Sequence, residues 1–151
     1  MDNNTKTIAV NRKARHEYFI EDTYEAGLVL TGTEIKSVRK GHVQFQDAYI
    51  DFIKNEAFVV GMNIAVYDHG NIFNHEETRN RKLLLHKYEI RKLAKAVTVK
   101  GYTVIPIRMY LKDGLCKMEI ALAKGKDLYD KRQTLKERDI KREIEKNVKT
   151  R

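Results

Sequence analysis

The sequence predicts a mostly β protein, with an antiparallel barrel of the OB type, one or two short helices and a basic C-terminal tail. Three observations predict it: short apolar runs alternate with polar turns, Asp113-Gly114 separates two long alternating segments, and residues 124–151 offer few apolar side chains. We expect a flexible arm over residues 1–10, a barrel over 11–123 and a tail over 124–151. A chain of this length forms one core, and an open α+β sheet is the alternative architecture.

The first part of the barrel is expected to consist of short strands. Residues 18–20 and 26–30 are apolar, and Gly27 in the second run marks a bulge or a close backbone approach. Residues 34–40 alternate less cleanly and are also compatible with a short helix ending at Gly41.

The middle of the chain predicts a hairpin followed by a helix. Residues 48–53 and 57–60 alternate on either side of a turn-like segment. Residues 68–82 form a polar loop. Residues 83–97 carry apolar side chains at spacings of three and four, which predicts an amphipathic helix that ends near Gly101 and plugs one end of the sheet.

The clearest strand pair comprises residues 102–111 and 115–123, because Asp-Gly is a strong hairpin turn signal. Pro106, the only proline, lacks a ladder donor and therefore predicts an edge strand or a bulge. Cys116, the only cysteine, is interpreted as a small buried hydrophobic residue and excludes an internal disulfide. One core face is expected to contain Ile105, Ile107, Met109 and Leu111, opposite Cys116, Met118, Ile120 and Leu122.

The charge of the chain points to a polyanionic partner. The formal net charge is +9 and the pI is about 9.6, and the tail, with 7 Lys and 4 Arg against 3 Asp and 3 Glu, contributes +5. Such charge favours RNA or DNA, since neutralising phosphates releases condensed counterions. A membrane is the weaker alternative, because the tail lacks a Trp- and Phe-rich face, and no transmembrane segment or signal peptide is recognisable. We expect a cytoplasmic location.

Catalytic signals are weak, so we expect neither an enzyme nor a cofactor. The five histidines are scattered, and no pair has metal-ligand spacing with a third ligand, so no metal site is expected. Ser37, the only serine, lacks a nucleophile-elbow setting, and there is no glycine-rich phosphate loop. The carboxylates are interpreted as turn caps or partners of Arg and Lys.

Two basic clusters border apolar segments and suit contact with the phosphates and sugars of folded RNA. Solvated loop charges are the alternative for any single residue. Four aromatic residues are candidates for stacking on bases, with burial in the core as the alternative. The clusters are Arg12, Lys13, Arg15 and His16, and Arg79, Arg81 and Lys82, and the aromatic residues are Tyr18, Phe19, Tyr24 and Phe45.

The tail is expected to be disordered or partly helical alone and to become helical on a partner. Ile140, Ile144 and Val148 form one stripe, and Glu137 with Lys141 is an acid-first pair four residues apart. These contacts are too few to hold an isolated helix. The alternative is a helix docked on the barrel itself.

Several ordered segments of the chain resemble the SmpB family of SsrA-binding proteins. They begin with Asn11-Arg12-Lys13-Ala14-Arg15-His16-Glu17-Tyr18-Phe19-Ile20 and continue with Glu25-Ala26-Gly27, Gly32-Thr33-Glu34-Ile35-Lys36-Ser37, Arg79-Asn80-Arg81-Lys82-Leu83-Leu84-Leu85, Gly101-Tyr102-Thr103-Val104 and Asp130-Lys131-Arg132. The resemblance implies an OB-fold, non-catalytic adaptor that binds the tRNA-like domain of transfer-messenger RNA (tmRNA). It also implies delivery to stalled ribosomes for trans-translation, with elongation factor Tu in the delivery complex, and we expect a monomer.

The resemblance also implies two sets of site residues. The body set binds RNA and combines family positions with the basic clusters: Asn11, Arg12, Arg15, His16, Glu25, Lys36, Arg79, Arg81, Lys82 and Leu84. The tail set enters the empty mRNA channel near the decoding centre of the small subunit: Lys124, Lys126, Tyr129, Asp130, Lys131, Arg132, Lys136 and Arg138. Two positions depart from the family, where Asp127 and Tyr129 replace the more usual Lys and His. A general OB-fold RNA or single-strand binder and a basic ribosome-associated structural protein are the alternative functions.

Overall fold

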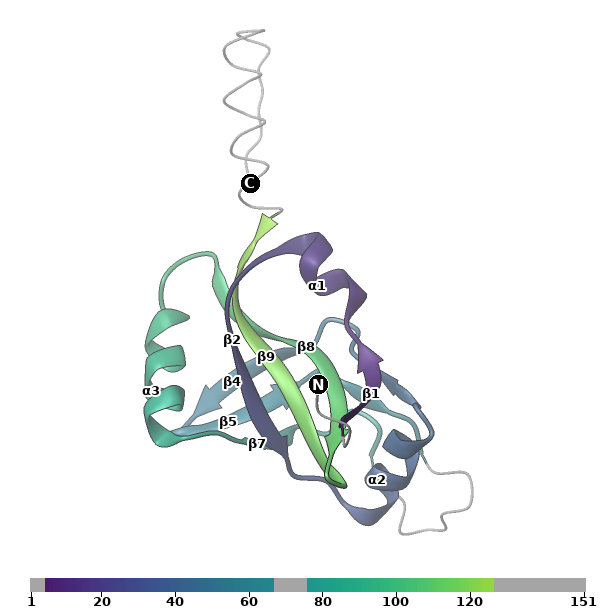
Figure 1. Ribbon diagram of the computed structural model, residues 1–151. Helices are drawn as coiled ribbons and strands as arrows, with labels where there is room; N and C mark the ends of the chain where they lie inside the picture. Colours follow the sequence, from purple (N-terminus) through teal and green to yellow (C-terminus); the bar gives the residue numbers. More distant parts are fainter. Residues whose placement is uncertain (1–4, 67–75, 127–151) are drawn as a thin grey trace, which may run out of the picture.

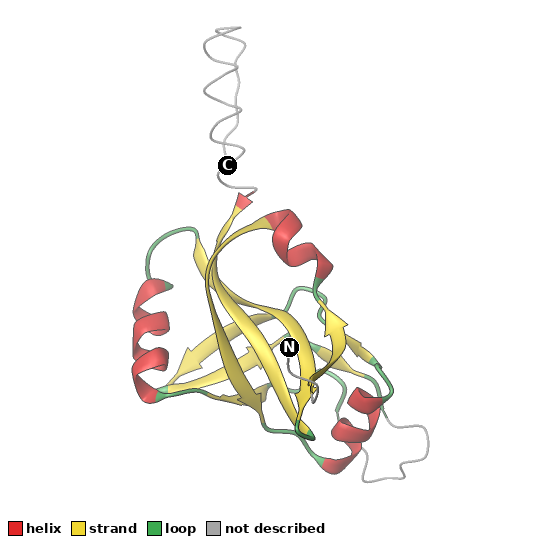
Figure 2. Cartoon of the chain, in the orientation of Figure 1, coloured by secondary structure: helices red, strands yellow, loops and turns green. Residues whose placement is uncertain are grey.

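The computed structural model describes residues 5–66 and 76–126, and these form mainly antiparallel strands (Figures 1 and 2). In this part of the chain, one sheet has the strand order β1-β8-β9-β2-β7-β5-β4, and β3 pairs with β6. The strands are β1 Thr5–Val10, β2 Tyr18–Leu28, β3 Val43–Gln44, β4 Tyr49–Ile53, β5 Glu56–Val60, β6 Asn63–Ile64, β7 Arg81–Leu84, β8 Tyr102–Lys112 and β9 Leu115–Gly125. The helices are α1 Arg12–Glu17, α2 Gly32–Arg39 and α3 Lys87–Ala96.

The large sheet bends around the core without closing into a complete barrel. Figure 1 shows β4, β5 and β7 crossing behind β2, β9 and β8. The hydrogen-bonded order of the described strands ends at β1 and β4, while β4 also packs against β8. The predicted mostly β, OB-type fold is confirmed, in the form of an OB-like sheet with one open seam.

Two predicted hairpins are present. Asp113 and Gly114 connect β8 to β9 with φ angles of +53° and +81°, the conformation that favours Asp-Gly in a tight hairpin turn. Lys54 and Asn55 likewise have positive φ and connect β4 to β5. The runs 18–20 and 26–30, expected as two strands, belong largely to the single strand β2, whose register shifts between Ile20 and Asp22.

The N-terminal segment differs from the expected flexible arm over residues 5–10. These residues form β1, which pairs antiparallel with β8 from Thr5 opposite Lys112 to Val10 opposite Arg108. The polar residues 1–6 predict a loose segment, but the β-branched residues Thr5, Thr7, Ile8 and Val10 favour a strand. Backbone hydrogen bonds to a long neighbouring strand hold the segment, and this pairing is not visible in local sequence.

A bulge at Pro106 reverses the faces of β8. The pairing with β9 shifts register between Pro106 and Arg108, so the predicted bulge is confirmed, although β8 is not an edge strand. The expected common face of Ile105, Ile107 and Met109 is therefore wrong. Ile105 and Ile107 pack in a small cluster with Ala14 of α1, whereas Met109 faces the main core.

The two longer helices frame the candidate site. The open question over residues 34–40 is resolved as a helix, α2, whose capping box joins Thr31 and Glu34. The helix predicted over 83–97 begins only at Lys87, because residues 81–84 form β7 between β2 and β5. Ile90 and Leu93 fix α3 to the core of the sheet.

Cys116 lies against the main core and is half-buried. Burial raises the pKa of its thiol to about 12. The thiol therefore stays protonated near neutral pH and packs as a small hydrophobic group, as the alternation in β9 predicted.

Candidate RNA-binding surface

The basic segment before β2 is helix α1, which one asparagine ties to the sheet. Asn11 Nδ2 donates to Pro106 O at 2.8 Å, and Asn11 N donates to Ile107 O at 2.8 Å. Ala14 is buried beneath the helix, whereas Arg12, Arg15 and His16 are exposed. Asn11, one of the predicted RNA-binding residues, therefore anchors α1 to the sheet. The side chains of Arg12, Arg15 and His16 face solvent on this anchored helix.

The beginning of the basic tail lies beside α1. Lys126 Nζ donates to Arg15 O at 3.0 Å and lies 5.2 Å from the centre of the Phe19 ring. Lys124 Nζ lies 5.6 Å from the centre of the Tyr102 ring. The end of the described chain therefore lies next to α1 (Figure 1). The remaining predicted tail residues, Tyr129, Asp130, Lys131, Arg132, Lys136 and Arg138, lie outside the described residues, as do Asp127 and the expected tail helix.

An open groove lies at the other end of the central strands. Its volume is about 720 Å³, and its walls include Glu25, Gly27, Leu84, His86, Lys112 and Lys117. Leu84 is 56% exposed although it belongs to a strand, and it lies directly opposite Gly27. A Cβ added at Gly27 would lie 3.4 Å from Leu84 Cβ, so the Leu84 side chain lies over this glycine.

Glu25 lies in this groove on the outer face of β2. Its cross-strand neighbour is Glu119, which is also an acid. Arg108 Nε donates to Glu119 Oε1 at 2.9 Å. Lys112 Nζ lies 3.7 Å from Glu25 Oε1. The pKa of the Tyr110 phenol is raised to about 12, first by burial and then by the nearby Glu25 carboxylate, so the phenol remains protonated near neutral pH. The partners of Glu25 are thus a lysine and a tyrosine.

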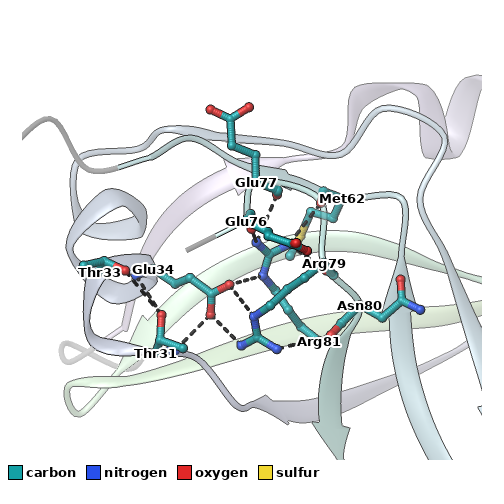
Figure 3. A network of polar contacts seen from close by, with 9 residues as sticks. All are labelled: Thr31, Thr33, Glu34, Met62, Glu76, Glu77, Arg79, Asn80 and Arg81. Carbon is teal, nitrogen blue, oxygen red and sulfur yellow. Dashed lines mark hydrogen bonds and ion pairs between the residues drawn. The ribbon is translucent and has the colours of Figure 1, made fainter. Parts of the chain in front are cut away.

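The third group of predicted residues surrounds the buried carboxylate of Glu34. Figure 3 shows this carboxylate between the guanidinium groups of Arg79 and Arg81. Arg79 makes a bidentate pair with it at 2.8 Å and 2.7 Å, and Arg81 Nε donates at 2.7 Å. Thr31 N donates at 2.9 Å. Both carboxylate oxygens therefore accept two hydrogen bonds, which uses the acceptor capacity of the group.

Arg81 is fully buried, so the expectation that it binds RNA directly is wrong for this structure. Its other donors bind backbone carbonyls: Met62 O at 3.0 Å, Arg79 O at 3.1 Å, and Glu76 O and Glu77 O at 3.0 Å each. Arg81 thus fixes the 76–80 segment against α2. The physical reason for the correction is nonlocal, because its carboxylate partner lies 47 residues earlier in the chain.

The charges of this buried network are maintained by their mutual contacts. Burial alone would raise the pKa of Glu34, but hydrogen bonds from Arg79, Thr31 and Arg81 lower it below its ordinary value. Burial lowers the pKa of Arg81, and Glu34 counteracts that shift, so we assign both groups as charged.

The network predicts sensitivity to acid. Glu34 has a lower pKa in the fold than in the unfolded chain, so its stabilisation is complete above the unfolded value and is lost as pH falls through the folded value. We expect the difference in unfolding free energy between the parent and Glu34→Gln to shrink as pH falls from about 7 to about 3. Urea unfolding of both proteins across this range would measure it. A difference that stays constant with pH would contradict an ionised Glu34.

The predicted body residues therefore occupy three places. Arg12, Arg15 and His16 lie at the α1 end, while Glu25 and Leu84 share the groove at the far end of β2, roughly 20 Å away by strand rise. Lys36 is exposed on α2, and Arg79 binds Glu34 of the same helix. Lys82 is paired with Glu56 at 3.0 Å on the surface.

Sequence reasoning missed the groove residues His86, Lys112 and Lys117. A signal was present in the hairpin, where the polar side chains alternate with core residues such as Met109 and Met118 and so must share the outer face. Within residues 5–66 and 76–126, no group of three His, Cys, Asp or Glu side chains is arranged to hold a metal ion. No helix in this part of the chain is both long and apolar enough to cross a membrane.

An OB-like sheet with exposed cations at one end and a groove at the other belongs to the class of nucleic-acid-binding OB-type proteins. The model of the family "SmpB protein" matches residues 8–150. The SsrA-binding protein of Caldanaerobacter subterraneus subsp. tengcongensis is 56% identical over 144 residues, covering 95% of this chain and 91% of that protein. The chain belongs to the SmpB family.

Two further comparisons agree with this membership. The SsrA-binding protein of Bacillus cereus strain AH820 is 58% identical over 139 residues, covering 92% of this chain and 90% of that protein. A solved chain described as "tmRNA-SmpB: a journey to the center of the bacterial ribosome" superimposes with a TM-score of 0.70 at 42% identity. That match covers 91% of this chain and 97% of the solved one.

Proposed function

We propose that this protein is the adaptor that binds the tRNA-like domain of tmRNA and delivers it to stalled ribosomes for trans-translation. The observation that carries the proposal is the groove in which a carboxylate, Glu25, and an exposed leucine, Leu84, lie together with Lys112 and Lys117, with Glu89 and Asp113 also in its walls. Such a mixed site suits a folded RNA whose unstacked bases and phosphates are both accessible. Elongation factor Tu is the expected third member of the delivery complex, and the role requires no catalysis.

Different side chains of the groove are suited to contact different parts of the RNA. Lys112 and Lys117 can approach phosphates, while Leu84 offers apolar contact to a base or ribose. Glu25 has acceptor capacity for a base or ribose donor, because its contact with Lys112 is longer than a direct hydrogen bond at 3.7 Å. Of the other predicted residues, Arg12, Arg15, His16, Lys36 and Arg79 extend the proposed contact surface.

The tail has a separate proposed role. Lys131, Arg132, Lys136 and Arg138 would contact ribosomal RNA phosphates in the mRNA channel, and Tyr129 would stack on a base of the decoding centre. An intact message would occupy the same space and exclude the tail. An empty mRNA channel would then be the signal that allows the adaptor to bind.

We expect Leu84→Ala to weaken tmRNA binding about ten- to a hundredfold, the value of burying one leucine side chain. The side chain is exposed in the free protein, so the fold should be little affected. Ile53→Ala is the matched control, because Ile53 is 45% exposed on the β4–β5 hairpin, outside the groove. Gel-shift titration with tmRNA against an unrelated hairpin competitor would measure both. Equal losses in the two variants would contradict the groove assignment.

We also expect Glu25→Ala to weaken tmRNA binding, even though the substitution removes a negative charge near RNA. The reason is the loss of an acceptor that the RNA uses and of the group that orients Lys112 and Tyr110. The same gel-shift titration tests it. Unchanged or tighter binding would show that Glu25 makes no productive contact.

A further inference from the structure

The outer face of α3 carries a continuous row of cations. Lys87, Arg91 and Lys95 follow one another at intervals of four residues, about 6 Å apart along the axis, with Lys92 beside them, and all four are exposed. The opposite side of the helix buries Ile90 and Leu93 in the core. Figure 1 shows α3 on one flank of the sheet, and no described element covers its outer side.

These cations lack carboxylate partners in residues 5–66 and 76–126. The ion pairs found there use Lys13, Arg79, Arg81, Lys82, Arg108 and Lys112, and none uses a side chain of α3. Glu89, the only acid of α3, accepts from His86 N at 3.0 Å as part of the capping box. Lys92 contacts the Tyr24 ring at 5.9 Å instead of a carboxylate. The described residues therefore do not neutralise the positive charge of this face, which is available to an external partner.

The arrangement is unfavourable for the helix itself. Like charges four residues apart repel, and both Lys87 with Arg91 and Arg91 with Lys95 have this spacing. Lys87 is also the first residue of α3, where the helix dipole disfavours a cation. The row of cations therefore does not stabilise the helix. A polyanion lying along the row would reduce both the repulsion between the cations and the unfavourable interaction with the helix dipole.

An aromatic pair lies at the N-terminal end of this face. The rings of His86 and Tyr88 stack with centroids 5.5 Å apart and an interplanar angle of 13°, and Tyr88 is 62% exposed. An exposed flat ring next to cations can stack an unpaired base while the cations bind its phosphates. Apart from Tyr88, the exposed row is cationic, so it lacks the apolar side chains by which an interfacial helix enters a membrane.

We propose that the outer face of α3 is a second RNA-binding surface, which contacts the phosphate backbone of a structured RNA segment separate from the segment in the groove. Lys87, Arg91 and Lys95 bind successive phosphates, and Tyr88 supplies a stacking platform. The proposal goes beyond recognition of the tRNA-like domain, because this face would let the adaptor contact a second RNA segment while the groove is occupied.

The test compares two full-length triple variants with the same loss of charge. Lys87→Gln/Arg91→Gln/Lys95→Gln removes the α3 row, and Lys6→Gln/Arg39→Gln/Lys54→Gln removes three exposed cations from other elements. The probe is a fully paired RNA hairpin that lacks a tRNA-like elbow, titrated at several salt concentrations. We expect the α3 variant to bind it more weakly and to reduce the slope of log K against log salt by about 2 to 3. The control variant should retain the parent slope.

Three outcomes would overturn the proposal: no change in the α3 variant, equal slope losses in both triples, or loss of binding to phosphatidylserine vesicles with RNA binding retained. The unfolding midpoint of the α3 variant should equal or exceed that of the parent, since repulsion is removed, and a large decrease would indicate a structural role instead. Leu84→Ala, run in parallel, should keep hairpin binding and weaken tmRNA binding. The Leu84→Ala measurement distinguishes an error in the α3 proposal from an error in the groove assignment.

Discussion

Replacing Glu34 with glutamine should lower the unfolding free energy by about 3–5 kcal/mol, the usual cost of removing one partner from a buried ion pair. Glu34 and Arg81 are both fully buried, so the substitution leaves the Arg81 guanidinium without its counter-charge in the interior. It also removes the bidentate contact with Arg79. The effect is large because solvent cannot replace the lost charge at this position.

Glu56→Gln is the matched control for this substitution. Glu56 pairs with Lys82 at 3.0 Å, but both side chains are more than 40% exposed. Exposed pairs contribute about 0–1 kcal/mol, so this variant should unfold close to the parent. Chemical unfolding followed by circular dichroism would measure both variants. Similar small losses for Glu34→Gln and Glu56→Gln would mean that the Glu34 network is not held as the structure describes it.

The network affects function by holding several segments of the chain in fixed relative positions. Four of the donors of Arg81 bind carbonyls between Met62 and Arg79, and its fifth binds the carboxylate at the start of α2. The 76–80 segment, α2 and the beginning of β7 therefore form one unit. Leu84 lies at the end of the same strand, so the network also sets the position from which one groove residue projects.

The features predicted correctly from sequence are those fixed by neighbouring residues. The Asp113-Gly114 turn and the β4–β5 hairpin depend on positive φ angles and on alternation within about ten residues. The helix α2, which the sequence pattern left open, is likewise fixed locally by the Thr31–Glu34 capping box. Family motifs added Glu25 and Leu84, which the structure then brings into one groove although they come from different strands.

The features predicted wrongly depend on distant partners. Leu84 and Tyr88 have helical spacing, yet β7 is a strand because β2 and β5 supply its hydrogen bonds. Met109 lies on a different face from Ile105 and Ile107, because one bulge inverts the alternation after Pro106. Arg81 looks like a solvated cation in its basic segment, and only the fold places Glu34 against it. Local sequence carries none of these contacts.

Removal of residues 127–151 should abolish peptide tagging on stalled ribosomes while leaving tmRNA binding within a few-fold of the parent. β9 ends at Gly125, so the truncation keeps the pairing of Tyr18 with Gly125 and the contact of Lys126 with Arg15. The groove lies at the opposite end of the central strands. The deleted segment has nine cations and six acids, a net +3, so its electrostatic contribution to RNA affinity should be modest at physiological salt.

Two point variants sharpen this prediction in the full-length chain. Lys131→Ala/Arg132→Ala should impair tagging and spare tmRNA binding, because these residues are assigned to the ribosome and not to the groove. Lys149→Ala/Arg151→Ala removes the same charge near the end of the chain and should have a smaller effect on tagging. Gel shifts with tmRNA and a tagging assay on ribosomes stalled at a message without a stop codon measure the two activities separately. If the truncated protein lost tmRNA affinity together with tagging, RNA recognition would depend on the tail, and the division between a binding body and a sensing tail would fail.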